Sequence, residues 1–563
     1  MNILIIGGYG TFGYGIADLL SDEADLTVTL AGRNLEKAQA ACSSLSGTAT
    51  FTALKLDRNG DLPAQIETPP NVIIDASGPF QNYGDGKRDN VINYALDQGC
   101  HYLDICDDLD FVDHIRGFDK TAQDKGITLL SGLSTYPVLT AAVARELSKD
   151  MDGITHIRAG IAPSPKAVMG RNVIAAVAAY AGKKHVSVLR DGKFETVHGL
   201  TETHRETICV PGQKPLPNIL FSVVEGPDPQ ELPRHFNGLQ NIWMSAGPRP
   251  EFLHRSLIGL AWGVRLKLLP HIAWLTGLFH KTQSLVTLGE HRGGMFVRAS
   301  NDAQSRSWHM IAEGDDGPRI PAIPSAIMVR KWLRSETIAA GARTAITDIE
   351  LDDFDGEFSK LKITHGRHDD TPQTRNLYEE ILGSAYQDMS EPLQDLHRIG
   401  EGKTFKGRCK VTRGKNPLSH IVATLLRFPK ASPDIPVKVV LTKNGNKEIW
   451  ERYFDDKRMV STQEAGRGKQ SRLVVERFGP IAVYLAILAE DGKQVLKTTG
   501  WSIFGIPLPK FLVPGGEVFE HDADGRFNFH VDMIAPIFGR LVKYEGWLEP
   551  LPGPSTVTSN PPD

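Results

Sequence analysis

Glycines near the start of the chain have the spacing of a phosphate-binding loop. The pattern G-x-G-x-x-G falls at Gly8, Gly10 and Gly13, directly after the apolar run Asn2–Ile6. The first glycine permits a tight turn, the second lets backbone N–H groups approach a pyrophosphate, and the third lets helix and strand pack closely. A glycine-rich turn without a ligand is the alternative. The predicted dinucleotide site comprises Gly7, Gly8, Tyr9, Gly10, Thr11, Phe12 and Gly13.

The residues after the second expected strand indicate which dinucleotide binds. NAD-specific sites carry an Asp or Glu there for the ribose 2′-OH, but this chain has Arg33 and Asn34. Arg33 offers a planar cation to a 2′-phosphate, and Asn34 can add a hydrogen bond. The predicted cofactor is therefore NADP(H), with Arg33 as an ordinary exposed residue at a helix start as the alternative. Asp57, after the third strand, could reach the adenine or cap the next helix.

Small residues follow the fourth expected strand, Asn71–Asp75. They let a dinucleotide pass over the backbone at the carboxyl end of a strand, where such sheets bind ligands. A plain turn at Pro79-Phe80 is the alternative. The candidates for the nicotinamide side are Ala76, Ser77, Gly78, Pro79 and Phe80.

Hydride chemistry also requires a group that handles a proton. Asp104 lies near the carboxyl end of the fifth expected strand, and Tyr102 shares its face by the two-residue period of a strand. Both are candidate catalytic residues that could orient substrate or relay a proton. A carboxylate that caps a helix or binds backbone is an equally good interpretation of Asp104.

The elements that position these residues alternate between strands and helices over residues 1–150. This rhythm predicts a doubly wound parallel sheet of the Rossmann type. The expected strands are Asn2–Ile6, Leu26–Ala31, Phe51–Leu56, Asn71–Asp75, His101–Ile105 and Thr128–Leu130.

Beyond residue 150 the rhythm changes. Residues 151–370 are expected to form a mixed α+β domain for substrate binding or dimerisation, ending in a polar linker at 366–372. Three Asn-Gly or Asp-Gly turns between apolar runs then predict an antiparallel, curved β-rich domain over 385–548. The Pro/Ser/Thr-rich tail 549–563 is expected to be disordered.

Composition narrows the function classes. A chain of 563 residues is too long for one core, and a formal net charge of −4 gives no reason to expect nucleic acid as a partner. The five cysteines lack CxxC spacing, which argues against a disulfide framework or structural zinc, and no metal site is expected. The start of the chain does not have the character of a signal peptide, so the expected location is the cytoplasm.

The segment Leu257–Phe279 is apolar and carries two tryptophans, but charged residues and a proline interrupt it. It predicts core helices or an interfacial helical hairpin rather than a membrane-spanning helix. Peripheral contact with the inner membrane is the alternative location that it leaves open. An apolar wall here beside the nicotinamide would favour an acyl or terpenoid substrate over an amino acid.

The motifs of residues 1–140 together resemble the saccharopine dehydrogenase-like NADP-binding family. The resemblance implies NADP(H) held by the glycine loop and Arg33, with the reactive ring near residues 76–80. The family's Gly-Glu after the fifth strand is replaced here by Asp107-Asp108, so an inherited role at that Glu is in doubt. Residues 385–548 are similar to a bacterial domain of unknown function (DUF4166-like), on motifs such as Val475–Pro480 and Asp524–Phe527.

Taken together, the chain is predicted to be an NADP(H)-dependent oxidoreductase that acts on a small or lipid-like molecule. A non-catalytic NADP-binding sensor, or a lipid-binding protein at a membrane, is the competing class. A second copy of the chain is the remaining candidate partner.

Overall fold

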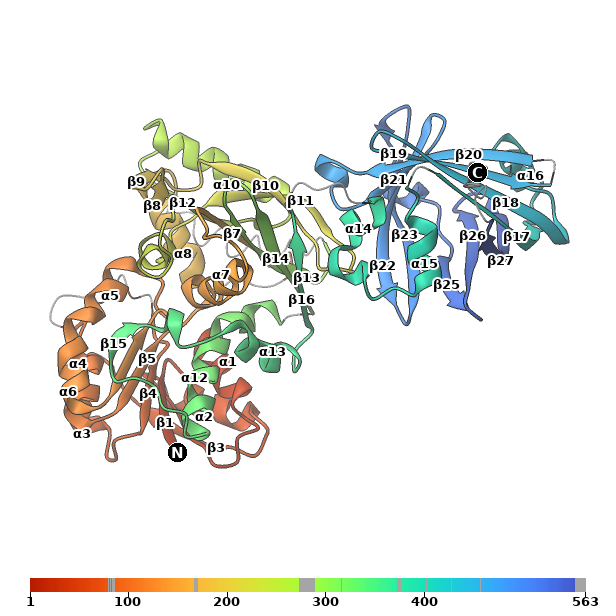
Figure 1. Ribbon diagram of the computed structural model, residues 1–563. Coiled ribbons are helices and arrows are strands. Elements are labelled where there is room, and N and C mark those ends of the chain that lie inside the picture. Colours follow the sequence, from red (N-terminus) through yellow and green to blue (C-terminus); the bar gives the residue numbers. More distant parts are fainter. Residues whose placement is uncertain are drawn as a thin grey trace, which may run out of the picture. The chain divides into compact units, whose positions relative to one another are not determined.

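The computed structural model describes residues 1–78, 80, 83, 87–166, 171–272, 289–314, 316–371, 376–400, 402–426, 428–455 and 457–551. The chain divides into two compact units (Figure 1). The first consists of Met1–Arg205 with Ile219–Thr364, and the second of Glu206–Asn218 with His365–Asp563. Each unit has a hydrophobic core of its own.

The first unit begins with a seven-stranded parallel sheet of order β15-β6-β5-β4-β1-β2-β3. Its consecutive strands are β1 (Asn2–Ile6), β2 (Thr27–Gly32), β3 (Thr50–Lys55), β4 (Val72–Asp75), β5 (His101–Asp104) and β6 (Thr128–Ser131). The helices that follow them are α1 (Thr11–Leu19), α2 (Leu35–Ser44), α3 (Leu62–Gln65), α4 (Asn90–Gln98), α5 (Leu109–His114) and α6 (Asp119–Lys125). The strand order reverses between β1 and β4, which confirms the doubly wound fold and marks the crevice where such sheets bind ligands.

The seventh strand of this sheet comes from far along the chain. β15 (Gly341–Thr344) pairs in parallel with β6, although these residues fall within the predicted 151–370 domain. A four-residue strand at a sheet edge has too little periodicity to be recognised in sequence. Helix α12 (Ile323–Leu333) precedes it, and Arg330 of this helix forms a 2.6 Å ion pair with Glu23 beyond α1. This contact holds the returning segment on the first sheet's helices.

A nine-stranded mixed sheet follows, most of it within the first unit, with order β10-β11-β12-β7-β13-β14-β16; β8 pairs with β12, and β9 pairs with β8. Its strands are β7 (His156–Ala162), β8 (Lys184–Arg190), β9 (Lys193–His198), β10 (Thr203–Ile208), β11 (Leu216–Val223), β12 (Asn241–Ala246), β13 (Arg292–Ser300), β14 (Ser305–Glu313) and β16 (Ile363–Asp369). The helices beside it are α7 (Thr140–Ser148), α8 (Arg171–Tyr180), α9 (Asp228–Glu231), α10 (Glu251–Arg265) and α13 (Leu351–Phe358). The predicted α+β character is confirmed.

Helix α7 joins the two sheets of the first unit. Its buried Ala142 and Val143 belong to one core cluster with Ile3 of β1 and Val297 of β13.

The predicted linker at 366–372 is wrong over its first part, since residues up to Asp369 continue β16. Backbone pairing between β16 and β14 holds these residues in a strand although their side chains are polar.

The second unit contains a closed antiparallel barrel of ten strands. Its strands are β17 (Gly402–Arg413), β18 (Ser432–Asn444), β19 (Lys447–Phe454), β20 (Lys457–Ala465), β21 (Val474–Phe478), β22 (Ile481–Glu490), β23 (Lys493–Ile503), β25 (Val518–Ala523), β26 (Arg526–Ala535) and β27 (Gly539–Pro550). Each strand pairs with its neighbours in chain order, and β27 pairs with β17 to close the ring. The elements outside the ring are α14 (Leu377–Leu382), α15 (Glu391–His397), α16 (Pro417–Leu425) and the short β24 (Ile506–Pro507).

The barrel confirms the predicted antiparallel β-rich domain. The sequence did not indicate that its sheet closes into a ring. Its last strand also corrects the predicted start of the tail, because β27 runs through Pro550. Backbone pairing with β17 extends to that residue, opposite Phe405. Residues 552–563 of the predicted tail lie outside the described residues.

Candidate cofactor and substrate site

The glycine loop lies at the reversal point of the first sheet, between β1 and α1. Gly7 has a φ of +81°, and a Cβ there would lie 2.7 Å from the carbonyl oxygen of Ala76 at the end of β4. A Cβ at Gly13 would overlap the carbonyl oxygen of Gly7, so only glycine lets α1 begin this close to the loop. Gly10 is exposed, and its Cβ would meet only one atom, at 3.1 Å. The loop is therefore tight on its inner side and open on its outer side.

Backbone amides at this open side fit a diphosphate. The amides of Gly7 and Gly8 donate to the carbonyl of Ala31 at 2.8 and 3.1 Å, which fixes the loop against β2. Gly10 is the N-cap residue of α1 and has no side chain with which to cap the first turn. The first-turn amides of a helix, here those of Thr11 and Phe12, have no intrahelical acceptor and attract anions. The structure thus places backbone N–H donors at the open side of the loop, where the predicted diphosphate site requires them.

The end of β2 presents the side chains predicted to select the cofactor. Arg33 is exposed and makes no hydrogen bond or ion pair with any residue that the structure describes. Asn34 caps α2, because its Oδ1 accepts a hydrogen bond from the amide of Lys37 at 2.9 Å. Its side-chain amide remains a donor. The Tyr9 ring packs over Gly32, and its hydroxyl accepts from the Asn34 amide at 3.2 Å.

Asp57 lies in the loop after β3 and is exposed. Its Oδ1 accepts from the amide of Asn59 at 3.0 Å, whereas Asp61 caps α3. The capping alternative for Asp57 is therefore wrong. Contact with an adenine ring stays a prediction.

A buried polar cluster at the end of β4 was not predicted. Asp75 is fully buried and pairs with Arg58, whose Nε lies 3.3 Å from the carboxylate. The Arg58 guanidinium stacks on the ring of Tyr83, 3.5 Å from its centre. Ser77 donates a hydrogen bond to Asp75 at 2.5 Å, and its hydroxyl lies 2.8 Å from that of Tyr83. The cluster fixes the loop after β4, and no local motif announces it because Arg58 follows a different strand.

Residues 76–80, which were predicted to lie beside the nicotinamide, have different surroundings in the structure. The backbone of Ala76 lies against the glycine loop, and Gly78 follows the anchored Ser77. Phe80 is buried, with its ring centre 5.2 Å from that of Phe111, so it packs in an aromatic cluster. Pro79 lies outside the described residues. The backbone from 76 to 78 remains the candidate surface for the nicotinamide.

Asp104 and Tyr102 are both completely buried. The Asp104 Oδ1 accepts three hydrogen bonds of 2.9 Å, from Ser131 and from the amides of Cys106 and Gly132, which ties β5 to the end of β6. Burial raises the pKa of Asp104 to about 7, against the lowering effect of these donors. Burial also raises the pKa of Tyr102. The geometry gives Asp104 a structural role, and a catalytic role for either residue stays a prediction.

Residues of the mixed sheet face this carboxyl edge. Burial, together with the negative charges of Asp108 and Asp110 at the start of α5, raises the pKa of Glu225 to about 7. The hydroxyl of Tyr180 lies in hydrogen-bond contact with the main chain of Glu225, and the charge of Asp107 acts on it. Figure 1 shows α8, which ends in Tyr180, near α5. A carboxyl group that is half-ionised near neutral pH therefore borders the site.

A second carboxyl group lies deeper in the mixed sheet. Asp228 is fully buried beside Thr140, and burial raises its pKa to about 7. Its charge acts on Tyr136, whose hydroxyl donates to the carbonyl of Ser245 at 3.1 Å. Neither Glu225, in the loop after β11, nor Asp228, at the start of α9, was predicted, because both lie more than 100 residues beyond the glycine loop. Their only sequence signal is an acidic residue beside a glycine or proline, which is common.

The departure from the family pattern at Asp107-Asp108 has a local structural explanation. Asp108 is the N-cap of α5, and its Oδ1 accepts from the amide of Phe111 at 2.9 Å. Asp107 is exposed. Asp108 thus stabilises the start of a helix at the carboxyl edge of the sheet.

The N-terminal segment that contains the glycine loop matches a known family of cofactor-binding domains. Residues 3–130 match the family model of the saccharopine dehydrogenase NADP binding domain. This match confirms the predicted dinucleotide-binding domain. Residues 389–548 match a domain of unknown function, DUF4166, which confirms the second resemblance. No curated protein sequence matches the chain.

Several solved structures align with parts of the chain at low identity. Saccharopine dehydrogenase (L-Glu forming) from Saccharomyces cerevisiae is 14% identical, with 65% of this chain and 99% of that chain covered and a TM-score of 0.45. GenD2 from gentamicin A biosynthesis, in complex with NAD, is 9% identical, with 61% and 88% covered and a TM-score of 0.32. A myo-inositol dehydrogenase from Corynebacterium glutamicum is 13% identical, with 45% and 69% covered and a TM-score of 0.26.

Neither a metal centre nor a membrane-spanning helix is found in the part of the chain that the structure describes. In the described ranges, no group of three or more His, Cys, Asp or Glu side chains is arranged to hold a metal ion. No helix within the same ranges has the length and apolar character needed to cross a membrane.

Asparagine at position 104 is expected to change the pH dependence of stability. Because the folded pKa of Asp104 lies near 7 and its ordinary value is 3.8, the folded chain keeps a proton that the unfolded chain releases between these pH values. The contribution of Asp104 to stability therefore falls as the pH rises from about 4 to 7. Asp104→Asn retains the oxygen that accepts three hydrogen bonds and removes the titration. Urea unfolding should show the variant gaining about 2–3 kcal/mol relative to the native chain between pH 5 and pH 8. Parallel pH dependences would contradict the assignment.

Proposed function

We propose that this chain is an NADP(H)-dependent oxidoreductase that acts on an apolar, lipid-like substrate. The proposal depends above all on one observation, the glycine loop open beside the exposed Arg33. The match of residues 3–130 to an NADP-binding family supports it. NADPH supplies a hydride when bound, and the residues of this chain position it and handle the proton.

The chain's own residues divide into binding and proton-handling groups. The loop amides from residue 11 onward hold the diphosphate, and Arg33 with the Asn34 amide holds the 2′-phosphate. The backbone at Ala76–Gly78 positions the ring. Glu225 holds or releases the proton that accompanies hydride transfer, since its pKa near 7 suits both directions at neutral pH.

The proposal of an apolar substrate rests on a buried apolar cluster beside Tyr136 and Tyr180, which would form one wall of the substrate space. These two side chains pack against a cluster that includes Ala178 of α8 and, from α10, Ala261 and Val264. The wall includes the first part of the predicted Leu257–Phe279 segment, and residues 273–279 lie outside the described residues. A wall of this kind favours an alkyl or polycyclic substrate over an amino acid.

A substrate panel tests the reaction class. NADPH oxidation is measured with trans-2-decenal, with 2-decanone, and with an amino acid paired with a 2-oxo acid. Turnover of the first two supports the proposal, whereas turnover of the amino-acid pair alone contradicts the substrate class. Tight NADPH binding without turnover of any of them would instead support the non-catalytic sensor. Peripheral membrane contact and a homodimer remain predictions.

Alanine at position 33 is expected to weaken NADPH binding by about 10- to 100-fold, because one charge-assisted contact contributes about 1.5–3 kcal/mol. NADH lacks the 2′-phosphate, so its affinity should change little. Isothermal titration calorimetry of Arg33→Ala with both nucleotides checks this. Lys37→Ala, which removes an exposed cation from the same helix start, is the matched control and should leave both affinities unchanged. An equal loss for NADH and NADPH would overturn the role of Arg33.

A further inference from the structure

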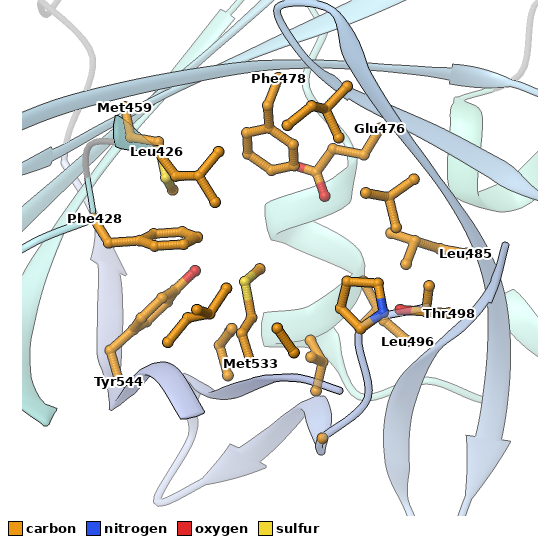
Figure 2. Close-up of a pocket in the computed structure, with 18 of the residues that line it drawn as sticks. Leu426, Phe428, Met459, Glu476, Phe478, Leu485, Leu496, Thr498, Met533 and Tyr544 are labelled. Atoms are coloured by element: carbon orange, nitrogen blue, oxygen red, sulfur yellow. The ribbon is translucent and has the colours of Figure 1, made fainter. Parts of the chain in front are cut away.

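The ten-stranded barrel of the second unit encloses a cavity of about 500 Å³. Its wall is formed almost entirely by aliphatic and aromatic side chains, among them Phe428, Leu485, Leu496 and Met533 (Figure 2). Cavities that hold small molecules in proteins measure about 300–1,000 Å³ and have mainly apolar walls with a few polar groups. The cavity thus has the size and surface of a ligand site, in a domain without an assigned activity.

Polar groups lie at separate points of this wall. Arg452 donates hydrogen bonds to Ser461 at 2.7 Å and to Glu476 at 3.1 Å, so its charge is paired. Figure 2 shows the Glu476 carboxyl, the Thr498 side chain and the Tyr544 hydroxyl directed into the cavity. Burial raises the pKa of Tyr544 to about 12, so it remains a neutral hydroxyl at physiological pH.

A second carboxylate lines the cavity at Glu520. Its Oε2 lies 2.8 Å from Nε2 of the buried His397 and accepts a 2.7 Å hydrogen bond from the amide of Gln494. The indole N–H of Trp501, which also lines the cavity, has no hydrogen-bond partner among the described residues. The wall therefore contains one paired cation, two carboxylates and the Tyr544 hydroxyl as a donor.

We propose that the barrel binds a neutral lipid-like molecule with one hydroxyl or carbonyl group. Apolar walls remove the hydrocarbon from water, and the Tyr544 hydroxyl, which Figure 2 shows directed into the cavity, provides a donor for the polar end. A fatty acid anion is disfavoured, because the charge of Arg452 is already balanced by Glu476 and the remaining carboxylate, Glu520, would repel it inside a medium of low dielectric constant. This inference is independent of the proposed redox function.

Exposed apolar side chains mark the entrance. Ile537 lines the cavity and is 66% exposed, and Phe511 is 76% exposed beside the cavity residue Leu512. Further exposed residues lie on segments that contribute to the wall, namely Leu418, Ile421, Phe504 and Ile506. An apolar rim of this kind is unusual on a soluble surface and lets a lipid enter without crossing a polar barrier.

Fluorescent displacement with the full-length chain tests the proposal. The uncharged dye N-phenyl-1-naphthylamine is added as the probe, and 1-hexadecanol or palmitate is titrated against it at pH 8. The alcohol should displace the dye, and palmitate should bind at least about tenfold more weakly. Failure of the dye to bind, failure of the alcohol to displace it, or stronger binding of palmitate would each overturn the proposal.

A matched pair of variants locates the binding in the barrel. Leu496 points into the cavity from β23, and the next residue, Lys497, is exposed. Leu496→Trp should fill the cavity and lower the affinity for dye and alcohol at least about tenfold, whereas Lys497→Trp should not. Near-UV circular dichroism and the thermal unfolding transition of each variant report whether the barrel itself is folded, and NADPH binding reports the same for the first unit. If Leu496→Trp binds NADPH and also binds 1-hexadecanol as the native chain does, the barrel is not the site.

Discussion

Glutamine at position 225 is expected to lower the rate of NADPH-dependent reduction by about 100- to 10,000-fold, the usual effect of losing a general acid or base. Because the pKa of Glu225 lies near 7, the carboxyl is protonated below that pH and can donate. The native rate of reduction should therefore decrease as the pH rises through about 7, and the residual rate of Glu225→Gln should be independent of pH there. Stopped-flow NADPH oxidation with trans-2-decenal measures both profiles.

The control for this variant is Glu195→Gln. Glu195 lies on β9, is exposed and pairs with Arg190 at 3.2 Å, so its loss should leave rate and pH profile unchanged. NADPH affinity should stay constant in both variants, because neither residue contacts the glycine loop. A Glu225→Gln chain with the native rate and the native pH profile would exclude Glu225 as the proton-handling group.

Valine at position 13 is expected to abolish measurable NADPH binding, with a loss of at least about 100-fold. The Cβ would overlap the carbonyl oxygen of Gly7, so α1 must move away from the loop and its first-turn amides with it. Overpacking of this kind costs about 1–3 kcal/mol in stability as well. Calorimetric titration with NADPH and thermal unfolding of the same sample measure both effects.

Gly15→Ala, on the same helix, is the matched control for Gly13→Val. A Cβ at Gly15 would lie 3.5 Å from that of Ala322, an ordinary contact, and alanine favours a helix by up to about 1 kcal/mol over glycine. This variant should bind NADPH normally and unfold no earlier than the native chain. Native affinity in Gly13→Val would contradict the position assigned to the diphosphate.

The sequence by itself determined the elements whose signals are local. The predicted strands of residues 1–130 are all present within one or two residues of their expected bounds, since apolar runs and the loop glycines act over a few positions. The barrel hairpins were likewise visible, because turns such as Asp491-Gly492 and Asp524-Gly525 require positive φ, and all four residues adopt it. Arg33 could be identified for the same reason, as a residue at a fixed distance from the loop.

Only the tertiary structure decided which distant residues meet. β15 completes the first sheet from position 341, and β27 closes the barrel on β17, because backbone pairing between distant strands leaves no local pattern in the sequence. The buried environments of Glu225 and Asp104 could not be predicted from the sequence either. Their pKa values depend on burial by neighbours from other parts of the chain, and burial is a property of the folded molecule. Local sequence thus defined the cofactor loop, while three-dimensional packing created the acid–base groups and the barrel cavity.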